Sequence, residues 1–106
     1  MKILFDQGTP VPLRYHLHNH EVHTAAEKGW SELKNGNLLE TAESERFDLL
    51  LTTDQSIRYQ QNLSSRKIAL LVLKTTSWPR IQNQISLVLD ALEDISTGDY
   101  VEIEFQ

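Results

Sequence analysis

Short apolar runs alternate with longer segments of helical periodicity along this chain. Five runs have the length and composition of strands, at residues 2–5, 21–24, 49–52, 68–73 and 100–105. The third and fourth are almost wholly apolar, which is typical of parallel strands covered on both faces. The last instead places Val101, Ile103 and Phe105 on one face. This pattern favours an edge strand, and it leaves the direction of that strand open.

The segments between these runs predict helices. A short helix is expected around residues 13–17, after two prolines that suit a first helical turn. A second is expected to begin at the capping segment 35–37 and a third, short and polar, to cover residues 56–63. A long last helix is predicted to start at Trp78, because apolar residues recur every three or four positions at Ile81, Ile85, Leu89 and Leu92.

Alternation of strands and helices is the pattern of an α/β fold. Short connections and right-handed crossovers then favour a central, mainly parallel sheet of about five strands flanked by helices. The chain has 106 residues, enough for one domain and too few for two, so a single domain over residues 1–106 is expected.

Composition narrows the functional classes. Cysteine is absent, which excludes disulfides and thiolate metal sites and makes a cytoplasmic location the expectation. No secretory signal and no apolar run near 20 residues is visible, so no membrane association is expected. The formal charge of −5 counts against a protein that coats nucleic acid non-specifically. The same net charge is compatible with an enzyme that binds nucleic acid through a metal ion and a local basic patch.

Two acids follow predicted buried strands in the same way. Asp6 comes directly after residues 2–5, and Asp54 comes two residues after the run at 49–52. Because ligands of open α/β sheets bind at the carboxyl ends of the strands, both acids are expected at one rim. Two close carboxylates need a cation or a proton, and hard oxygen ligands suit Mg²⁺ or Mn²⁺. The alternatives are a turn-forming Asp6 and an Asp54 that caps the helix beginning near Ser56.

Further candidates follow from position. Glu40, on the second predicted helix, is the candidate third acid, with a solvated helix face as the alternative. Cationic and aromatic residues that follow the third and fourth strands are expected at the same rim, where they would contact RNA phosphates or stack on a base. These RNA-binding candidates are Arg58, Tyr59, Lys74 and Arg80.

At these residues the chain resembles a PIN-like domain of the small DUF5615 kind. The resemblance extends to about Leu73 and rests on the segments 2–6, 20–24, 29–30 and, most specifically, 48–54 with its continuation to Leu63. It implies an α/β fold with a central parallel sheet, and an acidic cluster that binds Mg²⁺ or Mn²⁺ and hydrolyses RNA. Asp6 and Asp54 match the metal-binding positions. Gln7 and Asn35 stand where the family often carries acids.

The function that follows as an expectation is a metal-dependent ribonuclease with Asp6, Asp54 and Glu40 as catalytic acids and RNA as substrate. Many PIN domains are toxins of toxin–antitoxin pairs, so an antitoxin or other protein partner, or a homodimer, is expected. The alternative is a catalytically degenerate PIN-like module that binds RNA or a partner protein. A flavodoxin-like small-molecule binder is a third reading, but the four glycines form no phosphate-binding loop.

Overall fold

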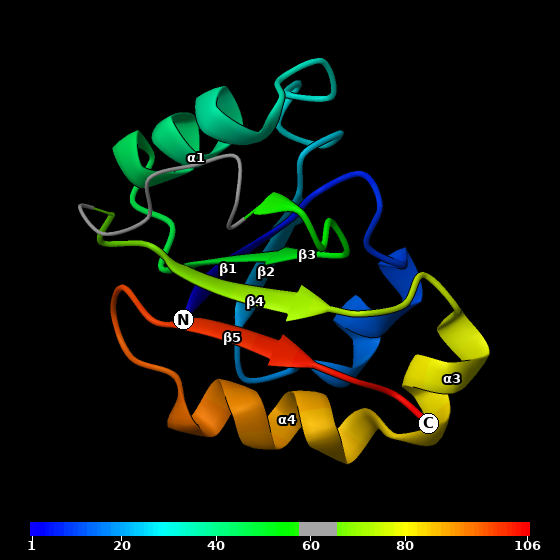
Figure 1. Cartoon of the computed structure of the whole chain (residues 1–106). Helices are drawn as coiled ribbons and strands as arrows, with labels where there is room; N and C mark the ends of the chain where they lie inside the picture. Colours follow the sequence, from blue (N-terminus) through cyan, green and yellow to red (C-terminus); the bar gives the residue numbers. More distant parts are fainter. Residues whose placement is uncertain (58–65) are drawn as a thin grey trace.

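The computed structural model describes residues 1–57 and 66–106 of the chain. Its centre is a five-stranded, all-parallel sheet in the order β2-β1-β3-β4-β5 (Figure 1). This arrangement confirms the predicted α/β fold with a parallel sheet. The strands are β1 (Lys2–Phe5), β2 (Glu21–Thr24), β3 (Leu49–Thr52), β4 (Ala69–Leu73) and β5 (Tyr100–Ile103).

Helices cover both faces of this sheet. The helix α1 (Asn35–Ser44) lies on one face, while the 3₁₀ helix η1 (Val11–His16), α3 (Trp78–Asn83) and α4 (Ile85–Asp94) lie on the other (Figure 1). Side chains of β1 alternate between the two: Ile3 and Phe5 join the core beneath α4, and Leu4 joins the core beneath α1. The residues of β3 and β4 are all buried, as their continuous apolar runs predict.

The edge strand β5 resolves a question that the sequence leaves open. It pairs in parallel with β4 alone, from Leu70 with Tyr100 to Leu73 with Ile103. Ile103 and Phe105 pack into the α4-side core, as the shared face predicts, and Val101 packs against it. The helix expected at residues 56–63 lies mostly outside the described residues.

The single long helix predicted from Trp78 onward is wrong, because the structure has two helices there. They are separated at Gln84, whose φ of −132° and ψ of 39° are not helical. The Gln84 amide holds the end of the chain: its Nε2 donates to the Gln106 carbonyl at 2.9 Å, and its Oε1 accepts from the Gln106 N–H at 3.4 Å. The break lets α3 pack beside η1 while α4 runs under β5.

The residues of α4 that face the core differ in one position from the apolar stripe that the sequence predicts. Val88 and Leu92 are buried, whereas Leu89, which the apolar spacing places on the buried stripe, is 37% exposed. Leu89 follows Val88 directly and so lies about 100° further around the helix, at the edge of the buried face.

Candidate metal centre at the carboxyl ends of β1 and β3

The direction in which the strand order grows reverses between β1 and β3. The chain leaves β1 toward β2 through η1 on one face, and leaves β2 toward β3 through α1 on the other. Open α/β sheets bind ligands where the strand order reverses in this way, outside the carboxyl ends of the strands. Asp6 directly follows β1, and Thr53 and Asp54 directly follow β3. The two predicted acids therefore flank the point at which this topology favours a ligand.

Threonine hydroxyls orient the Asp6 carboxylate. Thr9 is buried, and its hydroxyl lies 2.8 Å from Asp6 Oδ1 and 2.9 Å from the Leu51 carbonyl oxygen. Since a hydroxyl has one proton, it donates to one of these acceptors at a time. The other carboxylate oxygen, Oδ2, accepts from Thr52, whose side chain is fully buried. The Asp6 backbone N–H donates to Leu51 at 3.2 Å, which continues the β1–β3 pairing.

Thr52 joins the two candidate acids through a single hydroxyl. It donates to Asp6 Oδ2 and accepts from the Asp54 backbone N–H at 3.0 Å. The Thr52 hydroxyl thus holds the Asp6 carboxylate against the chain segment that carries Asp54.

The Asp54 side chain also caps a turn. Its Oδ1 accepts from the Ser56 backbone N–H at 3.0 Å and from the Ser56 hydroxyl at 2.7 Å. This is the capping role that the sequence offers as the alternative for Asp54. Capping and metal binding are compatible in principle, because a carboxylate has about four lone-pair sites.

Gly8 allows the loop after β1 to lie close to the end of β3. A Cβ added at this position would stand 2.6 Å from the Thr53 hydroxyl oxygen. That separation is too short for any side chain, so glycine is required unless Thr53 moves. The close approach keeps the loop that carries Asp6 and Thr9 against the segment that carries Thr52 and Thr53.

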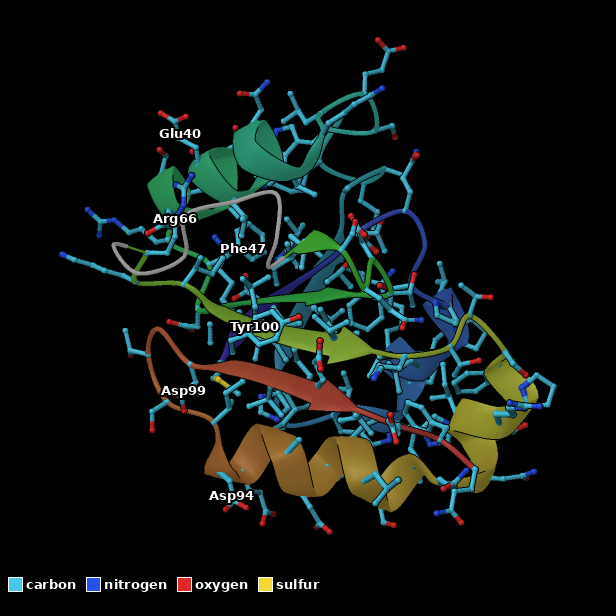
Figure 2. All side chains as sticks on the ribbon, viewed as in Figure 1. Glu40, Phe47, Arg66, Asp94, Asp99 and Tyr100 are labelled. Carbon is cyan, nitrogen blue, oxygen red and sulfur yellow. The ribbon has the colours of Figure 1, made fainter. Side chains whose placement is uncertain are left out.

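Glu40 lies apart from this centre. It is exposed on α1, and Figure 2 shows its side chain pointing away from the sheet. Among residues 1–57 and 66–106, no three histidine or acidic side chains are grouped closely enough to hold a metal ion. The structure does not bring Glu40 to Asp6, and its role as a third acid stays a prediction.

Two of the four RNA-binding candidates lie within the described residues, and they differ in their surroundings. Lys74 directly follows β4 at the carboxyl edge, where its Nζ forms an ion pair with Glu104 at 3.0 Å. Arg80 is exposed in α3, a helix whose N-cap Ser77 accepts from the Arg80 N–H at 3.4 Å. Arg58 and Tyr59 lie outside the described residues. Trp78, which follows β4 on the same segment, packs against the core with its ring 5.7 Å from that of His16.

A cavity next to Asp6 is the feature that the sequence does not predict. Its volume is about 510 Å³. Its walls come from the loop after β1, the turn after β2 and the start of α1. The aromatic residue in the Gly29-Trp30 turn is the one sequence signal that points to it.

Comparison with protein-family models, with curated proteins and with solved structures finds no match to this chain. The resemblance to PIN-like domains therefore stands on the residues quoted for it. Within the described residues, no helix is long and apolar enough to cross a membrane.

Proposed function

We propose that this chain is a PIN-like, metal-dependent ribonuclease that holds Mg²⁺ or Mn²⁺ at Asp6 and Asp54. The observation that supports it most is the junction at Thr52, whose hydroxyl contacts both the Asp6 carboxylate and the Asp54 backbone at the reversal of strand order. Topology and hydrogen bonding thus lead to the same pair of residues that the family resemblance selects.

The donor atoms suit a hard divalent cation. Carboxylate oxygens are what Mg²⁺ and Mn²⁺ prefer, and Mg²⁺ in proteins often takes one or two carboxylates and completes its shell with water and substrate phosphate. Asp6 is half-buried, and each of its oxygens accepts from one threonine, which leaves lone pairs for a cation. Two carboxylates at the rim are therefore a sufficient, if sparse, protein contribution.

The residues of the chain have separate tasks in this proposal. A bound divalent ion would lower the pKa of water and offset charge on the attacked phosphate. Thr9 and Thr52 fix the orientation of Asp6, and Asp54 supplies the second carboxylate. Lys74 and Arg80 lie on segments that follow β4 and would contact RNA phosphates, together with Arg58 and Tyr59. The acidic net charge of the chain fits a toxin whose antitoxin is a small basic protein. We also propose that the chain can form a homodimer.

Three observations favour the second candidate, a degenerate module that binds RNA or a partner protein. The Asp54 Oδ1 is occupied by Ser56, and Glu40 points into solvent on the far side of α1 (Figure 2). With neutral Gln7 beside Asp6, the centre has fewer acids than a typical PIN-like site. The same rim would then bind without cleaving.

Replacing Asp54 with asparagine is expected to abolish RNA cleavage while leaving the fold intact. We expect a loss of at least about 100-fold, because even partners that only orient metal ligands commonly cost 10–100-fold. The measurement is the rate of cleavage of a labelled single-stranded RNA by purified protein with Mn²⁺ or Mg²⁺, with and without a chelator.

The matched control is Asp94→Asn, which makes the same chemical change at an exposed residue, the last of α4 (Figure 2). It should cut at the wild-type rate. Undiminished cutting by Asp54→Asn would contradict the proposal. If the wild-type protein never cuts RNA but binds RNA or a basic partner protein, the ribonuclease proposal is overturned in favour of the binding module.

A further inference from the structure

The cavity beside Asp6 combines an apolar part with a polar rim. Ala25, Trp30 and Leu33 contribute apolar surface, whereas Asp6, Glu32 and Lys34 contribute charged groups. Its volume of about 510 Å³ falls within the roughly 300–1,000 Å³ that is usual for small-ligand sites. It therefore has the size and the mixed lining of a site for a small, flat, partly polar group.

The Trp30 wall is held in place by hydrogen bonds. The Trp30 N–H donates to the Ala25 carbonyl at 2.8 Å, and the Leu33 N–H donates to the Trp30 carbonyl at 3.0 Å. The turn begins with a reciprocal pair: the Thr24 N–H donates to Glu27 at 2.9 Å, and the Glu27 N–H donates to the Thr24 hydroxyl at 3.1 Å. These are the bonds of a capping box, which fixes the start of the turn.

The Trp30 ring itself is also fixed. Phe47 meets it edge-on with ring centroids 5.9 Å apart, and the Lys28 ammonium lies 5.3 Å from its centroid. Trp30 is half-buried, and it is one of the residues that line the cavity. An aromatic wall that is already ordered loses little entropy when a second ring stacks on it.

The charged groups that line this cavity favour some ligands over others. Asp6 and Glu32 are two carboxylates against the single ammonium of Lys34, which disfavours a bare phosphate inside it. A nucleobase is uncharged and flat, and its N–H groups can donate hydrogen bonds to carboxylates. Every base can also stack on an aromatic ring, whichever of the four it is. A base in the cavity would leave its own phosphate near Asp6, on the outside.

We propose that this cavity is a base-binding subsite, which takes one unpaired nucleobase of RNA against Trp30. The position of the phosphate at Asp6 rests on the ribonuclease proposed above, whereas the base subsite itself needs no metal. The subsite would give a physical reason for a single-stranded target, because a base inside a duplex cannot enter the cavity.

The test uses nucleosides without phosphate and without metal. In a Trp78→Phe background Trp30 is the one tryptophan, so its emission reports on the cavity. Adenosine and uridine are expected to quench this emission saturably, while ribose leaves it unchanged. Equilibrium dialysis of labelled adenosine should show at least a tenfold weaker affinity for Trp30→Leu than for the Trp78→Phe control, with circular dichroism confirming that both are folded.

The outcomes separate the two proposals. Saturable binding of nucleosides, with no effect of Mn²⁺ on the protein, would support the subsite and contradict the metal site. Cleavage of RNA by a protein that shows no quenching, and whose Trp30→Leu variant cuts normally, would overturn the subsite alone. Equal affinity for ribose 5-phosphate and adenosine monophosphate would also overturn it, since the base would then contribute nothing.

Discussion

Replacing Leu92 with alanine is expected to lower the free energy of unfolding by about 2–5 kcal/mol. Leu92 on α4 is only 4% exposed and belongs to the core between this helix and the sheet. Truncation removes buried methyl groups and leaves a cavity that the surroundings fill incompletely. Urea unfolding at 25 °C, followed by circular dichroism, measures the loss directly.

The matched control is Leu89→Ala, the same change on the same helix at a side chain that is 37% exposed. It should cost less, about 1 kcal/mol, since more than a third of the Leu89 surface is already in contact with solvent. Equal losses at the two positions would contradict the packing of α4 described above, in which Leu92 lies in the core and Leu89 at its edge.

Replacing Thr52 with valine is expected to destabilise the protein by about 1–3 kcal/mol and to impair the metal centre at the same time. Valine keeps the shape but removes the hydroxyl, so the Asp54 N–H loses its acceptor and the Asp6 carboxylate loses a donor. A buried group left without a partner costs its full desolvation. The measurements are urea unfolding and the Mn²⁺ dependence of the melting temperature.

Thr76→Val is the control for this change, because Thr76 is exposed and lies between β4 and α3 at the same edge of the sheet. Its effect should stay within about 0.5 kcal/mol. If Thr52→Val were as stable as Thr76→Val and responded equally to Mn²⁺, the Thr52 hydroxyl would not connect the two acids as described.

The sheet could be predicted from the sequence because its signals are local. The runs at β3 and β4 are apolar except for Thr52, and such continuous apolar runs are typical of parallel strands that are buried on both faces. The placement of Asp6 and Asp54 at one edge then follows from topology, since the ends of parallel strands share an edge. No distant contact had to be known for either inference.

The parts that escaped prediction depend on residues far apart in the chain. The break at Gln84 is stabilised by hydrogen bonds to Gln106, and no local sequence pattern predicts that these two residues pair. The direction of the Thr52 hydroxyl is a rotamer that only the packed site determines. The cavity needs three segments, the loop at Gln7, the turn at Trp30 and the start of α1, to meet in space.

Thermal unfolding with and without Mn²⁺ tests the central claim, a divalent-cation site at Asp6 and Asp54, most directly. A ligand that binds only the folded state at about ten times its Kd adds roughly 1.4 kcal/mol, which raises the melting temperature of a domain of this size by several degrees. We predict this rise for the wild type and for Asp94→Asn, and its loss in Asp6→Asn and Asp54→Asn. An unchanged melting temperature of the wild type in millimolar Mn²⁺, or an equal rise in all four proteins, would contradict the account.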